Sequence, residues 1–271
     1  MATLRQVRFS LAKTSLRIPL VRFRHRGLTE HDAFVGAYPR SGSTWLRFML
    51  VEILGGESSA FSTVNNAVPD VGYHRETAAI LPHHGRLIKT HEPYQKEYKK
   101  AIYLMRDPRD VCLSEFAYQK ALGLAGNDFD VYLGRFLRGE VNPFGSWVNH
   151  VGSWIDAVDS GRVNGLLVRF EDLRREPEPR LAELIQFLGV PVDRERIHQA
   201  VANNSLEKMK EKEKKNPQRA SAKGRFVRSG AVEGWRAEFT TAQFELVQKY
   251  AGKVITRMNY PGVETLEKEL V

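Results

Sequence analysis

The segment AFVGAYPRSGSTWLRFML, residues 33–50, constrains the fold more than any other part of the chain. It begins as an apolar run typical of a buried strand and breaks at a proline. A short turn rich in serine and glycine then leads into a second apolar run of helix-forming residues. A strand that turns tightly into a helix is a geometry that holds phosphate groups, because the free N–H groups of the helix face the turn. The segment therefore predicts an anion-binding loop.

This loop differs from an ATP-binding loop of the Walker type. A Walker loop reads G-x-x-x-x-G-K-[ST], and its lysine reaches the outer phosphates while its hydroxyl holds Mg²⁺. Here Gly42 is followed by Ser43 instead of lysine, and Gly36 is out of register. No apolar strand ends in an aspartate clearly placed for a metal, so we predict no metal site. A nucleotide or small-molecule kinase with a degenerate phosphate loop stays open as an alternative.

Strands and helices alternate along the rest of the chain. Apolar runs predict strands at residues 33–38, in a short run ending near Thr90, within 100–110 and at 164–173. Helical patterns occupy residues 44–54, 111–122, 147–158, about 179–188 and 239–250. This alternation predicts an α/β fold, a single domain with a central parallel β-sheet flanked by helices. We expect residues 57–82 to form a loop with a short helix, and the charged residues 207–226 a solvated helix end and a mobile loop.

The first residues differ in composition from the rest. Residues 1–29 contain seven lysines and arginines and no acidic residue. This composition overlaps with organelle transit peptides and with basic arms that contact anionic membranes, but we favour a plain basic extension. We therefore divide the chain into a basic N-terminal extension, residues 1–30, and one domain, residues 31–271. Peripheral membrane contact by the extension stays open.

Composition also limits the classes of partner and compartment. The formal net charge is +9 and the isoelectric point is near 9.6, which favours anionic partners such as nucleotides, sulfated molecules or polyanions. The single cysteine, Cys112, excludes an internal disulfide framework and a cysteine-based zinc site. No run of about 18 apolar residues occurs, so no segment is expected to span a membrane. With no signal-peptide core either, we predict a cytoplasmic protein.

Three turns that follow predicted strands carry most of the candidate chemistry. Ligands of open α/β sheets bind outside the carboxyl ends of the strands, so these turns should meet at one edge. They contribute many donors for anionic oxygens and one imidazole: Arg40, Ser41, Ser43 and Thr44, then His91, then Arg106 and Ser114. A helix that starts near Thr44 adds its partial positive charge. The sequence thus predicts an anion site beside a potential base.

These segments resemble those of the PAPS-dependent sulfotransferases, where PAPS is 3′-phosphoadenosine 5′-phosphosulfate. YPRSGSTW resembles the family's 5′-phosphosulfate loop, usually Y-P-K-S-G-T-T-W, and YLMRDPRDVCLSEF resembles its 3′-phosphate-binding segment. KTHEP resembles the strand end that carries the catalytic histidine. VRFEDL, NSLEKMK and RFVRSGAVEGWRAEFT resemble later segments, and the matches keep the family's order over residues 33–240. The resemblance implies a P-loop-kinase-like sulfotransferase fold, with PAPS as co-substrate, PAP as product and no metal.

The resemblance also implies which residues bind the nucleotide. The 5′-phosphosulfate would lie in the loop formed by Arg40, Ser41, Gly42, Ser43, Thr44 and Trp45. The 3′-phosphate would meet Arg106 and Ser114, joined by Arg228, Ser229 and Gly230 from the late loop. Trp45 is expected to stack on adenine. Leu206 stands where the family commonly has phenylalanine, so an aliphatic group would cover the other face of the base.

The implied reaction is in-line transfer of SO₃ to an acceptor hydroxyl or amine. His91 is the candidate general base, and its neighbour Glu92 is the second choice. Arg40 replaces the family's lysine, so it can neutralise the leaving phosphate but cannot donate a proton. Lys89 would supply a second cation at the same centre. A homologue that binds the nucleotide without catalysis stays open.

The acceptor is expected between the nucleotide segments, in residues 57–82 and 119–146. Aromatic residues there suit a phenolic, polycyclic or sugar acceptor, while Arg75, Arg135 and Arg138 suit a polar or anionic one such as a carbohydrate. We therefore expect a small-molecule or carbohydrate acceptor and no nucleic acid. A polyanion-binding protein without enzymatic activity stays open as a third class of function. Neither the choice between O- and N-sulfation nor the oligomeric state follows from the sequence.

Overall fold

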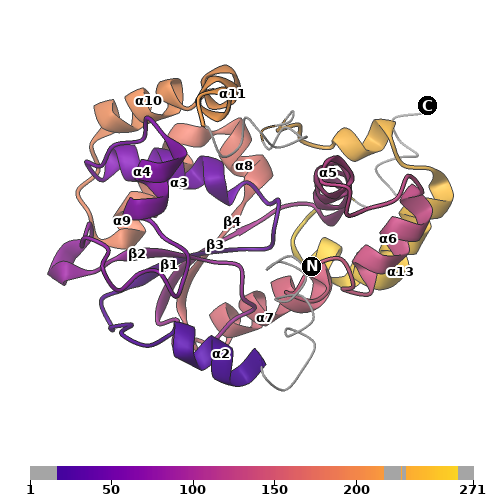
Figure 1. The fold of residues 1–271 in the computed structure, drawn as a ribbon, viewed down its shortest axis with the longest axis horizontal. Coiled ribbons are helices and arrows are strands. Elements are labelled where there is room, and N and C mark those ends of the chain that lie inside the picture. Colours follow the sequence, from indigo (N-terminus) through magenta and orange to yellow (C-terminus); the bar gives the residue numbers. More distant parts are fainter. Residues whose placement is uncertain (1–16, 217–226, 228–229, 262–271) are drawn as a thin grey trace.

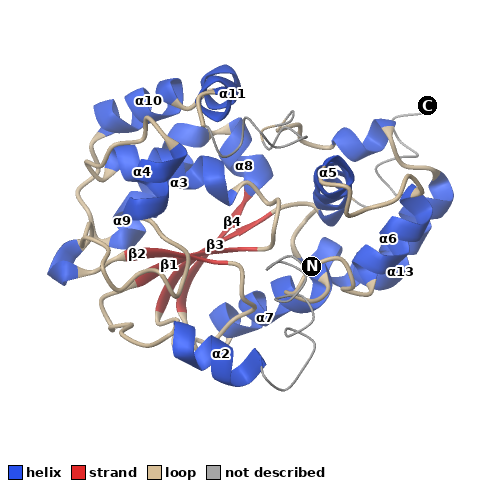
Figure 2. Cartoon of the chain, in the orientation of Figure 1, coloured by secondary structure: helices blue, strands red, loops and turns tan. Residues whose placement is uncertain are grey.

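The computed structural model describes residues 17–216, 227 and 230–261, and its centre is a parallel β-sheet (Figure 2). The strands are β1 (Ala33–Ala37), β2 (Leu87–Thr90), β3 (Lys100–Met105) and β4 (Asn164–Arg169). In the described chain they lie in the order β2-β1-β3-β4, and each pair is parallel. The predicted α/β fold with a central parallel sheet is confirmed.

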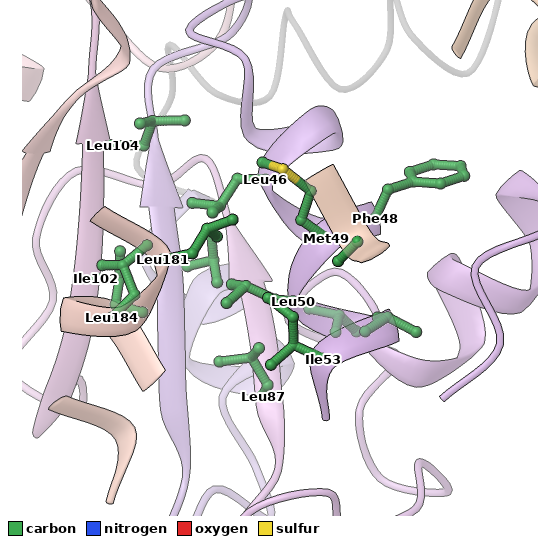
Figure 3. Close-up of a cluster of buried hydrophobic side chains, with 14 of the residues drawn as sticks. Leu46, Phe48, Met49, Leu50, Ile53, Leu87, Ile102, Leu104, Leu181 and Leu184 are labelled. Atoms are coloured by element: carbon green, nitrogen blue, oxygen red, sulfur yellow. The ribbon is translucent and has the colours of Figure 1, made fainter. Parts of the chain in front are cut away.

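Helices cover both faces of this sheet (Figure 1). One face packs on α3 (Ser43–Ile53), α4 (Phe61–Ala67), α9 (Pro177–Leu188) and α10 (Arg194–Asn203). Figure 3 shows leucines of α3 and α9 interleaved with Leu87, Ile102 and Leu104 of the strands. The opposite face packs on α6 (Phe129–Leu137), α7 (Trp147–Asp159) and α13 (Thr241–Arg257). Alternating strand residues thus enter two separate apolar clusters, as period-two strands require.

The remaining elements are short or lie at the edges of the sheet. They are α2 (Arg17–Arg24), η1 (Pro82–His84), α5 (Pro108–Ala121), α8 (Phe170–Arg175), α11 (Leu206–Lys214) and η2 (Gly234–Ala237). The expected short helix within residues 57–82 is α4, and the described part of the charged segment 207–226 forms most of α11. No helix of the described chain is both long and apolar enough to cross a bilayer.

The strand predicted over residues 164–173 ends four residues early. Arg169 is the last residue of β4 and pairs with Met105, the last residue of β3. Beyond this pair no neighbouring strand offers hydrogen bonds, and residues Phe170–Arg175 turn into α8. Two helices also begin earlier than predicted, because Pro108 and Pro177 occupy the first helical turn, where proline is favoured.

The topology places a switch point, where open α/β sheets form their ligand crevice, at the carboxyl ends of β1 and β3. The chain leaves β1 into α3 on one face of the sheet, whereas the chain that follows β3 packs α7 on the other face. Neighbouring strands whose connections diverge in this way form the usual ligand site of open α/β sheets. Residues 38–42 and 106–107 stand at this point.

Candidate active site

The loop after β1 is held in a conformation that exposes the start of α3. Arg40 and Gly42 have positive φ angles, 69° and 94°. Gly42 is the N-cap residue of α3, and no side chain caps the helix. The ring of Phe170 packs directly against Gly42, since a Cβ built there would lie 2.6 Å from Phe170 Cδ2. The first N–H groups of α3 thus border the loop without a competing side-chain acceptor.

The hydroxyl of Ser41 gives a direct test of whether this loop suits an anion. Ser41 is fully buried, and its Oγ has no hydrogen-bond partner in the described chain. A buried hydroxyl without a partner is costly, so such a group commonly marks the place of a missing ligand atom. An anionic oxygen would accept this hydrogen bond and meet the positive end of α3. The residues present therefore fit a phosphate or sulfate group.

We predict that Gly42→Ala destabilises the protein and perturbs the loop. An alanine at φ 94° carries the left-handed backbone cost of roughly 1–2 kcal/mol and would also collide with Phe170. Urea unfolding measures the change in the free energy of unfolding. Gly123→Ala is the matched control, since Gly123 has φ 70° with nothing within 4 Å of the added methyl. Equal costs for the two variants would contradict the close packing of Phe170.

Two arginines and a serine join this loop to the turn after β3. Arg40 Nε donates to Ser114 Oγ of α5 at 3.1 Å, and its guanidinium lies 4.8 Å from the ring centre of Tyr118. Arg106 donates to the carbonyl oxygen of Arg40 at 3.3 Å and stacks 4.7 Å above Phe170. The two predicted anion-binding segments thus form one continuous wall with two guanidinium groups.

His91 directly follows β2 and has a defined tautomer. Its Nδ1 lies 2.6 Å from the carbonyl oxygen of Ala37. A carbonyl only accepts, so Nδ1 carries the proton and Nε2 keeps a lone pair. Burial, followed by the charge of Lys89, lowers the pKa of His91 to about 3. His91 is therefore neutral at pH 7 and can accept a proton through Nε2.

His150 of α7 fixes the backbone of His91. Its Nε2 donates to the carbonyl oxygen of His91 at 2.9 Å, and the Tyr103 hydroxyl donates to its Nδ1 at 2.8 Å. His150 is fully buried, and both of its ring nitrogens are hydrogen-bonded, so it is a satisfied core histidine. Its effect on the site is indirect, because it orients the backbone that carries His91.

Comparison with protein-family models identifies the family of this chain. A model described as "Sulfotransferase domain" matches residues 30–259. The chain belongs to the sulfotransferase family. It is accordingly an enzyme that transfers a sulfuryl group from PAPS. This result agrees with the geometry of an anion loop beside a neutral imidazole.

Curated and solved relatives support the same family and fold. Human Sulfotransferase 2B1 is 30% identical over 262 residues, covering 89% of this chain and 70% of the relative. Human Sulfotransferase 2A1 is 28% identical over 242 residues, with 80% and 82% coverage. A retinol dehydratase in complex with retinol and PAP has a TM-score of 0.68 at 20% identity, covering 88% of this chain and 86% of that one. Mouse sulfotransferase SULT7A1 complexed with PAP has a TM-score of 0.66 at 23% identity, with 86% and 88% coverage.

In this sulfotransferase the late segment reaches the crevice through α5. Arg106 donates to the carbonyl oxygen of Ala231 at 2.8 Å, and Asp110 accepts from the backbone N–H groups of Glu233 and Trp235, each at 3.0 Å. Gly230, next to Ala231, is thereby brought close to the site. Arg228 and Ser229 lie outside the described residues. Asp110 stands within the quoted RDPRD segment, so its role in holding the late segment could have been proposed from the sequence.

The side of the site predicted for adenine contains Trp45 and Leu206. Trp45 Nε1 donates to the carbonyl oxygen of Asn204 at 2.8 Å, and Leu206 begins α11 two residues later. The guanidinium of Arg174 lies 5.3 Å from the Trp45 ring centre. Arg174 was not identified from the sequence, because no local pattern connects it to the loop. Asn204 opens the quoted NSLEKMK segment, but its contact with Trp45 was not predicted. The bond to Asn204 holds the indole in one orientation.

The other charged candidates of the sulfotransferase are paired. Lys89 Nζ lies 3.1 Å from Asp70 Oδ1, and Glu92 lies 3.3 Å from Arg24 of α2. Glu92 is thus drawn toward α2, whereas His91 bonds to Ala37 at the end of β1. Within the described ranges no group of three or more His, Cys, Asp or Glu side chains could hold a metal ion.

Proposed function

We propose that this sulfotransferase transfers SO₃ from PAPS to an acceptor hydroxyl or amine by in-line displacement, with His91 as the general base. The hydrogen bond between His91 Nδ1 and the carbonyl oxygen of Ala37 carries the proposal, because it leaves Nε2 ready to take a proton. PAPS supplies the sulfuryl group, and its 5′-phosphate departs with the bridging oxygen. The catalytic domain is proposed to comprise residues 31–271, and residues 1–30 a basic extension.

The loop and the two arginines would hold the anionic ends of the nucleotide. Ser41 and the first N–H groups of α3 bind the 5′-phosphosulfate, together with Gly42, Ser43 and Thr44. Arg106 and Ser114 bind the 3′-phosphate, joined by the late loop with Arg228, Ser229 and Gly230. Trp45 and Leu206 enclose the adenine.

Arg40 is proposed to neutralise the charge that develops on the leaving phosphate. Its guanidinium is always protonated, so it acts by electrostatics alone. Lys89 supplies a second cation next to His91. A bound anion in this crevice favours the imidazolium, so the proton affinity of His91 rises when the donor binds.

The acceptor is proposed to be a small molecule with a nucleophilic hydroxyl or amine. Phe144 lies 5.7 Å from the His91 ring centre, and Tyr118 lies against Arg40, so aromatic surface borders the base and the loop. Arg138 is paired with Glu140 at 2.9 Å, and Arg75 stacks on Phe23 of α2. These pairings weaken the case for an anionic carbohydrate. The cytoplasmic location stays a prediction.

We predict that 3′,5′-ADP, the product PAP, raises the melting temperature far more than 5′-AMP or Mg-ATP at equal concentration. A ligand at 100 times its Kd stabilises the native state by about 2.7 kcal/mol, which thermal denaturation detects readily. Arg106→Ala should abolish most of this shift, because the 3′-phosphate loses its guanidinium partner. Arg138→Ala, an exposed arginine outside the crevice, is the matched control.

Two outcomes would replace the proposal. A shift with Mg-ATP and none with 3′,5′-ADP would point to the kinase alternative. A shift with every polyanion that disappears steeply with salt would point to a polyanion-binding protein. The positive result leads to an acceptor screen with PAPS and three probes: 2-naphthol, a primary alcohol and an aromatic amine.

A further inference from the structure

The carboxylate of Asp70 pairs with Lys89, two residues before His91, although no quoted motif contains Asp70. We propose that Asp70 is a positioning residue, which holds the ammonium of Lys89 in place and offsets the repulsion between Lys89 and the imidazolium formed on His91. This inference rests on the proposed function of His91. It concerns the ion pair beside β2, next to His91.

The backbone places Asp70 beside Lys89 along the edge of the sheet. Lys89 N donates to the carbonyl oxygen of Pro69, and Val71 N donates to the carbonyl oxygen of Lys89, each at 2.8 Å. These bonds form a parallel bridge between Asp70 and Lys89. Asp70 therefore keeps its position beside β2 independently of its side chain.

Two buried or half-buried arginines secure this segment from both sides. Arg47 of α3 donates to the carbonyl oxygens of Val64 and Val68, at 3.2 and 2.5 Å, at the end of α4. Arg24 of α2 donates twice to the carbonyl oxygen of Val71, at 2.6 and 3.1 Å. The segment is thus anchored just before and just after Asp70, so its carboxylate is presented from a rigid backbone.

The positively charged groups around Asp70 show what its carboxylate can offset. Lys89 Nζ lies 3.1 Å from Asp70 Oδ1, and the side chains are 13% and 47% exposed. Burial by itself raises the pKa of Asp70, but Lys89, His91 and Arg47 together bring it below its ordinary value, so the group is ionised at neutral pH. Proton transfer to His91 adds a positive charge near the ammonium of Lys89, which already disfavours the imidazolium, as His150 also does. Asp70 is the acidic group that opposes this accumulation.

A contribution to the stability of the fold does not by itself account for the ion pair between Asp70 and Lys89. A partly exposed ion pair contributes little to stability, and backbone hydrogen bonds already hold the segment. Removing the charge of Asp70 should therefore spare the fold and impair the reaction. This difference separates a positioning residue from a structural one.

The first test compares Asp70→Asn, Asp70→Glu and the control Asp156→Asn, whose partner Arg257 lies on the surface. With PAPS and 2-naphthol as the probe acceptor, Asp70→Asn should lower kcat at least tenfold and leave KM for PAPS unchanged. The alkaline limb of kcat should move to lower pH, because the ammonium of Lys89 loses its counter-charge. Asp70→Glu should restore part of kcat, and Asp156→Asn should match the wild type.

The second test does not depend on the acceptor. NMR of ¹⁵N-lysine-labelled protein follows the titration of Lys89, assigned with Lys89→Arg, and Asp70→Asn should titrate at lower pH than the wild type. An unchanged Lys89 titration overturns the proposal, as does a kcat within twofold of wild type or a lost thermal shift with 3′,5′-ADP. A wild-type protein without PAPS turnover instead overturns the proposed function, while the lysine titration still decides whether Asp70 holds Lys89.

Discussion

His91→Asn is expected to lower kcat for sulfuryl transfer by about 10²–10⁴-fold, the usual contribution of a positioned general base. Asparagine can still reach the carbonyl oxygen of Ala37, which His91 Nδ1 contacts at 2.6 Å. It offers no basic nitrogen for the acceptor proton. The variant should therefore lose catalysis while the nucleotide site stays intact.

Two measurements check this expectation together. Initial rates with PAPS and saturating acceptor give kcat, and the melting-temperature shift with 3′,5′-ADP reports the nucleotide site. His198→Asn is the control, since His198 lies exposed on α10 and pairs with Glu178. If His91→Asn kept more than a tenth of the wild-type kcat, proton removal would belong to another group. Glu92→Gln would then be the next variant, although Glu92 pairs with Arg24.

Local sequence patterns were sufficient to predict the strands of the sheet and the loop after β1. A strand, a tight turn and a helix start are each encoded by neighbouring residues, and they give β1, the loop after it and α3 close to the predicted limits. The end of β4 was wrong because it depends on a distant partner. β4 ends at Arg169, opposite Met105, the last residue of β3. The sequence of residues 170–173 gives no signal that the strand has ended.

The residues of the candidate site likewise fall into two groups, those that the local sequence predicts and those that only the fold brings together. Residues in strand-end turns, such as Arg40, Arg106 and His91, meet because the carboxyl ends of parallel strands meet. Asp70, Arg174 and Asn204 come from outside those turns and reach the site through tertiary packing. Nothing in the local sequence distinguishes Asp70 and Arg174 from other polar residues, so only the folded arrangement identifies them. Asn204 begins the quoted NSLEKMK segment, but only the fold shows that its carbonyl oxygen accepts from Trp45.

Arg40→Ala is expected to lower kcat by about 10²–10³-fold, the loss typical of removing one electrostatic contact to a developing oxyanion. The guanidinium is held by Ser114 at 3.1 Å and by the ring of Tyr118 at 4.8 Å, so it is oriented before the donor binds. Arg40→Lys keeps the charge but loses both restraints. Its kcat should lie between those of the alanine variant and the wild type.

The comparison of Arg40→Ala with Arg40→Gly separates chemistry from backbone strain. Arg40 has φ 69°, which glycine adopts without cost and alanine does not. Equal losses of kcat in both variants, measured with PAPS and the acceptor from the screen, would assign the effect to the missing guanidinium. A variant with unchanged kcat and a raised KM for PAPS would contradict the proposed role. In that case Arg40 would only bind the donor, and neutralisation of the leaving phosphate would fall to Lys89 and the N–H groups of α3.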